Sequence, residues 1–275
     1  NVHFRSDDPP EAIARKALRV NLSDLAAKGA SAHGYLLSLA LPKRLTMPWL
    51  ESFAAGLAAD QEQFSIVLLG GDTTATEGPL TIAISAFGTL PAGTMTRRFG
   101  AKPGDIVFVT GTIGDSGAGL AVLKDQIAGG SDIARQTLVD RYRVPSPRMA
   151  AGVALRGVAS AALDVSDGLL ADLAHISDVS GVRIEVDAQR VPRSPALIST
   201  AGEAMSAIMD AVTAGDDYEI AFTAPGDTRD QIARVALQTG TVVTEIGRVL
   251  SGAGVVLLDS AGAEIPVLRK GYTHF

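Results

Sequence analysis

The feature that most constrains the fold of this chain is the alternation of short apolar runs with longer helix-like segments. The run 106–111 (IVFVTG) has the length and apolar composition of a buried strand. Segment 79–90 alternates apolar and polar residues, as a strand with one solvent-exposed face does. Segment 7–30 opens with Asp residues and prolines suited to a first helical turn and closes at a glycine. Strands alternating with helices predict mixed α/β sheets in both halves of the chain.

The turn-forming segment 101–105 (AKPGD) has the composition of a domain boundary. We therefore expect two domains, at 1–102 and 103–275, which is a usual size for a chain of 275 residues. The predicted helices are 7–30, 47–64, 115–128, 131–143, 147–157, the second part of the motif 163–173, more than one helix around 194–210, and 228–238. The predicted strands are 34–42, 65–72, 79–90, 106–111, 161–164, 182–186, 218–224, 241–249, 254–258 and 264–268.

Composition excludes several classes of function. The net charge is −6 and no basic run is longer than a pair such as Arg97–Arg98, which argues against nucleic acid as a partner. The chain contains no cysteine, so disulfides and thiolate zinc sites are excluded. No uncharged apolar stretch reaches the roughly 18 residues of a membrane span, and we expect a cytoplasmic protein. The chain starts at Asn1, and NVHF reads as the tail of a strand, so we expect a preceding segment to be missing.

The segment 163–173 (LDVSDGLLADL) places two carboxylates where a predicted strand turns into a helix. Ser166 or Asp167 could cap the helix, but capping leaves Asp164 unexplained. Carboxylates about 4 Å apart repel by roughly 4 kcal/mol at an effective dielectric near 20, so a Lys, an Arg or a metal ion should lie nearby. Neither Lys nor Arg occurs between Arg156 and Arg183. We expect this turn at the ligand-binding edge of a parallel sheet.

Three further segments place acidic residues at the ends of predicted elements. Asp24 lies three residues after Asn21 on one helix face, Asp72 follows an apolar strand and two glycines, and Asp216 and Asp217 precede a strand. Taken singly, each segment is better explained as a solvent-exposed helix position or a tight turn. Together they favour Mg²⁺, which prefers carboxylates, water and phosphate oxygens. With 4 His in the chain, a His-based zinc or iron site is disfavoured.

The segment 111–120 (GTIGDSGAGL) places glycines between a strand and a helix start, as phosphate-binding loops do. It matches neither the Walker pattern nor a spaced G-x-G-x-x-G, and we favour close packing of strand on helix over phosphate binding. Nucleophilic catalysis has no support, because Cys and the G-x-S-x-G elbow are both missing from the sequence.

Many of these motifs occur in the same order in one known family. NVHF, NLSDLAAKGA, LLGGDTT, TRRFGAKPGD, VTGTIGDSGAGL, SPR, LDVSDGL, GDDYE and KGYTHF span essentially the whole chain. In these motifs the sequence resembles the thiamine-monophosphate kinases, which belong to the superfamily of aminoimidazole ribonucleotide synthetase and selenophosphate synthetase.

The resemblance implies a two-domain fold of mixed α/β class, an N-terminal sheet that completes a β-barrel across a homodimer, and a C-terminal layered α/β domain. It implies transfer of phosphate from ATP to thiamine monophosphate, assisted by several Mg²⁺ ions. Carried over by position, Asp24, Asp72, Asp164 and Asp167 are similar to metal ligands, and Gly71, Asp72, Arg98 and Ser166 to nucleotide contacts. His3, Asp216 and Tyr272 match residues that hold thiamine phosphate.

The chain departs from this pattern in two places. The family usually has Glu where this chain has Asp216, and its early Gly-Asp-Asp and Thr-Thr-Asp segments, which supply further Mg²⁺ ligands, are absent. The chemistry agrees with the resemblance, because a phosphate oxygen is already anionic and needs cations rather than a general base. We expect no catalytic base. Another enzyme of the superfamily, or a binding protein that has lost turnover, remains the alternative.

Overall fold

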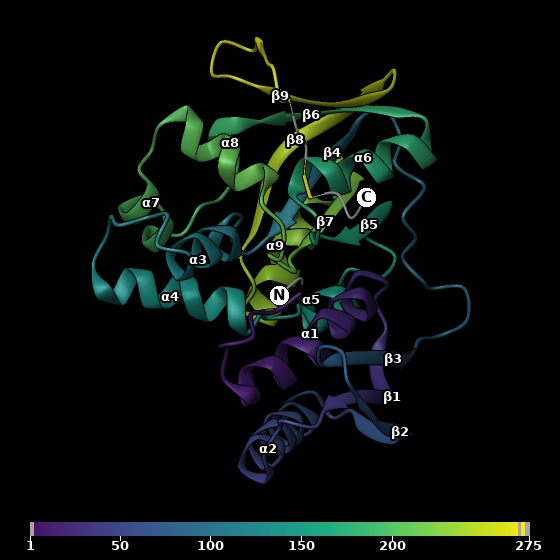
Figure 1. Ribbon diagram of the computed structural model, residues 1–275. Helices are drawn as coiled ribbons and strands as arrows, with labels where there is room; N and C mark the ends of the chain where they lie inside the picture. Colours follow the sequence, from purple (N-terminus) through teal and green to yellow (C-terminus); the bar gives the residue numbers. More distant parts are fainter. Residues whose placement is uncertain (1–2, 269–270, 273–275) are drawn as a thin grey trace.

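The computed structural model describes residues 3–268 and 271–272 of the chain. Within these residues the strands form two sheets, which we call the small sheet (order β2-β1-β3) and the large sheet (order β10-β9-β6-β8-β4-β7-β5). Figure 1 shows the small sheet with α2 at one end of the molecule, and α1 between it and the large sheet. The expected mixed α/β class and two-domain organisation are confirmed.

The small sheet carries the first core. Strand β1 pairs parallel with β2 and antiparallel with β3. Apolar residues of α1 and α2, including Leu18, Leu22 and Phe53, pack with Tyr35 and Leu37 of β1. The elements of this part are α1 (Pro10–Ala27), β1 (Ser31–Pro42), α2 (Met47–Phe64), β2 (Val67–Thr76) and β3 (Thr81–Thr89).

Helix α1 is shorter than predicted at both ends. Pro10 occupies the first turn as expected, but the Asp8 carboxylate accepts hydrogen bonds from the backbone N–H of Arg5 and from Arg143 Nε instead of capping the helix. Gly29 follows the helix with a φ of 70°, a conformation that glycine adopts at no steric cost. Phe4 packs against the first core, and residues 3–4 form a bend rather than the expected strand.

The large sheet is covered by helices on both faces. One face packs against α6 and α8 and the other against α5 and α9, so β4 between them is buried along its whole length. The elements of this part are β4 (Asp105–Thr110), α3 (Asp115–Leu123), α4 (Asp132–Arg143), α5 (Met149–Ala154), β5 (Ala161–Asp164), α6 (Leu169–Ser180), β6 (Val182–Asp187), α7 (Pro195–Ala201), α8 (Met205–Thr213), β7 (Ile220–Pro225), α9 (Arg229–Thr239), β8 (Val243–Ser251), β9 (Gly254–Leu258) and β10 (Glu264–Ile265), with 3₁₀ turns at Ala188–Arg190 and Gly226–Thr228.

Three sequence expectations differ from this arrangement. Strand β5 is an edge strand that pairs antiparallel with β7, so the expected parallel edge is wrong. The helix predicted over 115–128 ends at Leu123, because Asp125 takes a positive φ of 57°. The helix predicted near 147–157 covers only Met149–Ala154, whereas the helices predicted around 194–210 are present as α7 and α8.

The edge strand β2 is exposed along nearly its whole length. Val67, Leu68 and Leu69 present an apolar run there, each with more than two fifths of its surface accessible. The small sheet is therefore open in the single chain, and the described strands close no barrel. Exposed apolar edge strands are unusual in proteins that remain monomeric.

Candidate functional site

The turn between β5 and α6 is held by a carboxylate that the sequence did not single out. One side-chain oxygen of Asp172, in the first turns of α6, accepts hydrogen bonds from the backbone N–H groups of Ser166, Asp167 and Gly168 at 2.9, 2.9 and 3.1 Å. The N-cap residue is Gly168 and makes no side-chain cap. The alternative in which Ser166 or Asp167 caps the helix is therefore wrong.

Asp164 ends β5 and faces α1, where Asp24 lies. Burial and the nearby charge of Asp24 raise the pKa of Asp164 to about 6, and desolvation also raises the pKa of Asp24. No Lys or Arg lies near Asp164 in the sequence, but the fold brings two from distant positions close to the pair. Lys28 donates to the carbonyl of Ala162 at 3.4 Å and acts by charge on both carboxylates, and Arg98 acts by charge on Asp24.

The two carboxylates nevertheless make no ion pair within 4 Å with any described Lys or Arg. Two oxygen donors that are costly to keep charged, and that have no close cation, suit a hard divalent ion. Asp24 and Asp164 thus fit the expected Mg²⁺. The structure brings these two predicted ligands together.

The other predicted ligands lie apart from this pair in the single chain. Asp72 is on the exposed strand β2, where its side chain accepts a hydrogen bond from the N–H of Thr73. Gly71 lies so close to β1 that a Cβ would be 1.8 Å from the carbonyl oxygen of Leu37, so a side chain is excluded there. Across residues 3–268 and 271–272 no three acidic or His residues cluster closely enough to hold a metal ion.

A cavity of about 560 Å³ opens where the start and the end of the chain meet the β5–α6 turn. It is within the usual size range of small-molecule sites. Tyr272 donates its backbone N–H to the carbonyl of Asp167 at 2.8 Å, which anchors the end of the chain at this turn. The predicted site residues on its wall are His3, Ser166, Asp167, Asp216 and Tyr272.

The segment AGDDYE alternates between the cavity and the interior. Asp216 and Tyr218 line the cavity, and both have positive φ, at 71° and 52°, which is uncommon outside glycine. Asp217 and Glu219 point away from it and are completely buried. Such backbone strain persists only where surrounding contacts impose it. Here, the N–H groups of Asp216 and Tyr218 donate to the carbonyls of Ser166 and Val165.

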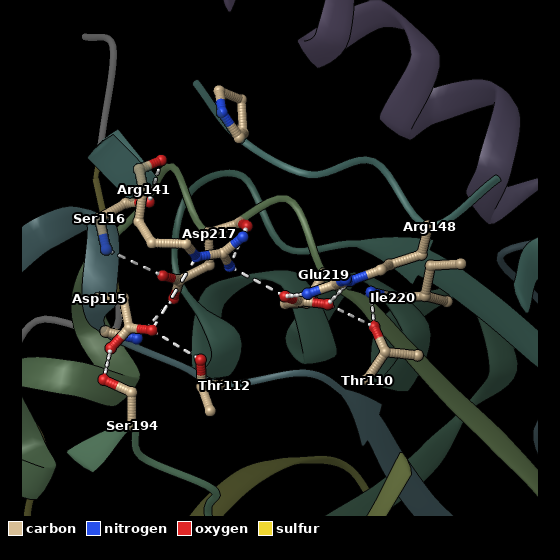
Figure 2. A network of polar contacts seen from close by, with 12 residues as sticks. Thr110, Thr112, Asp115, Ser116, Arg141, Arg148, Ser194, Asp217, Glu219 and Ile220 are labelled. Atoms are coloured by element: carbon tan, nitrogen blue, oxygen red, sulfur yellow. Dashed lines mark hydrogen bonds and ion pairs between the residues drawn. The ribbon is translucent and has the colours of Figure 1, made fainter. Parts of the chain in front are cut away.

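Figure 2 shows the buried network that holds this segment. Asp217 accepts hydrogen bonds from the N–H of Gly114 at 2.7 Å and of Ser116 at 3.3 Å. A protein carboxylate therefore already occupies the N-terminus of α3. This favours the packing interpretation of 111–120 over the phosphate loop.

Glu219 is the centre of the other half of the network. Arg141 Nη2 donates to it at 2.9 Å, Arg148 Nε at 2.6 Å and the Thr110 hydroxyl at 2.7 Å. Burial lowers the pKa of the Arg148 guanidinium, but its hydrogen bonds to Glu219 and the charge of that carboxylate raise the pKa above its ordinary value. Neither arginine was predicted from the sequence, because each lies more than 70 positions from Glu219.

Comparison with known proteins finds a matching family and named relatives of this chain. Its residues 1–90 match the family model described as AIR synthase related protein, N-terminal domain, and residues 102–260 match the corresponding C-terminal domain. A thiamine-monophosphate kinase from Salmonella typhimurium is 41% identical over 273 residues, which cover 99% of this chain and 83% of that protein. The chain belongs to the thiamine-monophosphate kinase family.

Solved structures of the family have the same fold. The thiamine-monophosphate kinase from Stenotrophomonas maltophilia superposes with a TM-score of 0.87 at 40% identity, covering 94% of this chain and 81% of that one. AaThiL complexed with AMPPCP and TMP superposes with a TM-score of 0.86 at 32% identity, covering 100% of this chain and 84% of that one. The family resemblance read from the motifs is confirmed.

None of the described helices is both long enough and apolar enough to cross a membrane. A cytoplasmic location stays a prediction.

Proposed function

We propose that this protein transfers the γ-phosphoryl group of ATP to thiamine monophosphate, giving thiamine diphosphate and ADP. The observation that carries the proposal is the cavity formed by His3, Asp216, Tyr272 and the β5–α6 turn. The three residues that match thiamine-phosphate contacts of the family lie on its wall, although they come from the two ends of the chain and the loop before β7. The AaThiL complex with an ATP analogue and TMP supports the same pair of ligands.

The side chains of the cavity suit a ligand with a cationic ring and a phosphate. Tyr272 is half-exposed and offers an aromatic face, which attracts a cation such as thiazolium by about 0.5–2 kcal/mol. Asp216 places a carboxylate on the same wall. His3 can donate a hydrogen bond to a phosphate oxygen, and does so more strongly when protonated.

Asp24 and Asp164 would hold Mg²⁺, and Asp72 and Asp167 would add ligands once nucleotide is present. When bound, Mg²⁺ would neutralise charge on the transferred phosphoryl group. The chain itself orients the acceptor in the cavity, and the β5–α6 turn carries Ser166 and Asp167 at the cavity wall. The attacking phosphate oxygen is anionic, so in-line transfer proceeds without a general base.

The exposed face of β2 supports a homodimer in which two small sheets combine into a barrel. Phe87 of β3 and Leu36 of β1 are also exposed and extend the apolar run of Val67, Leu68 and Leu69. Such a dimer would also carry Asp72 into a site shared between subunits. A domain boundary near residue 102 agrees with the ranges that the two family models match.

The test is ADP release by the purified protein with ATP and Mg²⁺, with thiamine monophosphate, thiamine or no acceptor added. We expect turnover only with thiamine monophosphate, together with formation of thiamine diphosphate. Turnover with an aminoimidazole precursor instead would identify another enzyme of the superfamily. Binding of thiamine monophosphate without any ADP release would identify a non-catalytic binding protein.

A further inference from the structure

Lys16 lies directly behind the wall of the cavity, on the face of α1 turned towards it. Its side chain is about 6% exposed, and its Nζ donates to a carboxylate oxygen of Asp216 at 2.8 Å. The same ammonium group is 3.7 Å from the ring centroid of Tyr142, another residue of the cavity wall. The two residues of the ion pair are 200 positions apart in the sequence.

Both carboxylate oxygens and the backbone N–H of Asp216 make hydrogen bonds within the chain. The oxygen that does not contact Lys16 accepts a hydrogen bond from the Tyr218 hydroxyl at 3.1 Å. Its backbone N–H donates to the carbonyl of Ser166, and its φ is 71°. Aspartate has one side-chain torsion fewer than glutamate, so two donors suffice to set the direction of the carboxylate.

The Lys16–Asp216 pair is not needed to dock α1 on the large sheet. Helix α1 also packs against α5 and β5, and Arg19 donates to the carbonyl of Pro145 at 2.9 Å. Burial lowers the pKa of Lys16 even with Asp216 opposing the shift, so the buried ammonium is costly. An apolar side chain of the same length would satisfy packing alone, so the charge is retained for another reason.

We propose that Lys16 is a positioning residue for the acceptor substrate, which fixes the Asp216 carboxylate in the orientation that contacts the ligand. This rests on the proposed function, in which the cavity holds thiamine monophosphate. Lys16 acts only through Asp216 and does not line the cavity itself. It compensates for the shorter side chain of Asp216, whose position the family usually fills with Glu.

The test compares Lys16→Met with the wild-type protein in steady-state kinetics for both substrates. Loss of a charge-assisted hydrogen bond to a contact residue should raise the KM for thiamine monophosphate by about tenfold or more. The KM for ATP should stay within about twofold, because Asp216 does not contact the nucleotide. The matched control is Arg15→Met, which removes an ion pair between α1 and Asp60 away from the cavity and leaves Arg19 on Asp60.

A double-mutant cycle separates positioning from a structural effect. In an Asp216→Asn background, Lys16→Met should change the KM for thiamine monophosphate by less than about twofold, because the group that it orients is already altered. Equal effects of Lys16→Met on both substrates, or full independence from Asp216→Asn, would overturn the inference. If Lys16→Met does not fold, Lys16→Gln should show a smaller change in the same direction.

Failure of this inference differs from failure of the proposed function. A wild-type protein that does not phosphorylate thiamine monophosphate overturns both. An active wild-type protein whose Lys16 variants keep an unchanged KM for thiamine monophosphate overturns only the role of Lys16.

Discussion

Two pairs of carboxylates near the large sheet have opposite surroundings. Asp217 and Glu219 are completely buried, and the chain supplies their donors, from the N–H groups at the start of α3 and from Arg141 and Arg148. Asp24 and Asp164 also lie where burial disfavours their charge, but no described cation pairs with them within 4 Å.

The difference between the two pairs lies in where their positive partners come from. A completely buried carboxylate whose donors all belong to the chain stabilises one conformation and exposes no oxygen to a ligand. A carboxylate that is desolvated beside another carboxylate still requires a cation. The pair Asp24–Asp164 is therefore open to an external ion, whereas Asp217–Glu219 is closed. Variants of both pairs and of their neighbours, and the addition of Mg²⁺, test this comparison.

Asp164→Asn should show the largest effect, a fall in turnover of about a thousandfold, because the carboxylate that we propose as an Mg²⁺ ligand would supply several kcal/mol of transition-state stabilisation. Its stability should be unchanged or higher, since the pKa of Asp164 is already raised to about 6 and the neutral side chain suits its surroundings. Kinetics and thermal unfolding on the same sample measure both. A variant that keeps its turnover, or that unfolds more easily, would mean that Asp164 stabilises the fold as Asp217 and Glu219 do.

Glu219→Gln should instead lower the free energy of unfolding by about 3 kcal/mol, because it removes the completely buried charge that pairs with Arg148 and one of the two carboxylates that pair with Arg141. The matched control is Glu245→Gln, whose partners Arg190 and Arg229 are more than half exposed, and which should cost less than about 1 kcal/mol. Chemical denaturation of both variants provides the measurement. Equal losses of stability would mean that burial of the network contributes nothing.

Replacing one arginine beside each pair tests the same contrast with the charge kept. Arg148→Lys loses one of two hydrogen bonds to Glu219 and should lower the free energy of unfolding by about 1.5–3 kcal/mol, without changing the KM for ATP. Arg98→Lys, at an exposed position, should leave stability unchanged and raise the KM for ATP several-fold, because the planar fork that grips phosphate is lost. The reverse pattern would contradict the comparison.

Addition of Mg²⁺ should have the smallest effect, and it is a readout that does not involve turnover. At about five times its Kd, Mg²⁺ should stabilise the wild-type protein by about 1 kcal/mol. The shift in thermal unfolding should vanish in Asp164→Asn and persist in Glu245→Gln. A shift of equal size in Asp164→Asn would assign the ion to another place.

Much of the secondary structure could be predicted because it depends on neighbours in the sequence. The observed α2 (Met47–Phe64) and α4 (Asp132–Arg143) lie at or close to the predicted bounds, and β3 (Thr81–Thr89) alternates exposed and partly buried residues with the predicted period of two. The motifs also predicted that His3, Asp216 and Tyr272 serve one ligand, and the structure places them on one cavity. Their roles stay predictions.

Sequence periodicity and motif order by themselves determined the class of fold, most elements and the family. Only the tertiary structure decided which charged groups meet: Lys16 with Asp216, Lys28 near Asp164, and Arg148 with Glu219. It also decided that β5 is antiparallel to β7, and that Asp172 rather than Ser166 or Asp167 holds the turn. The physical reason is that helices and strands follow from periods of a few residues, whereas pairing between distant charges depends on how those elements pack.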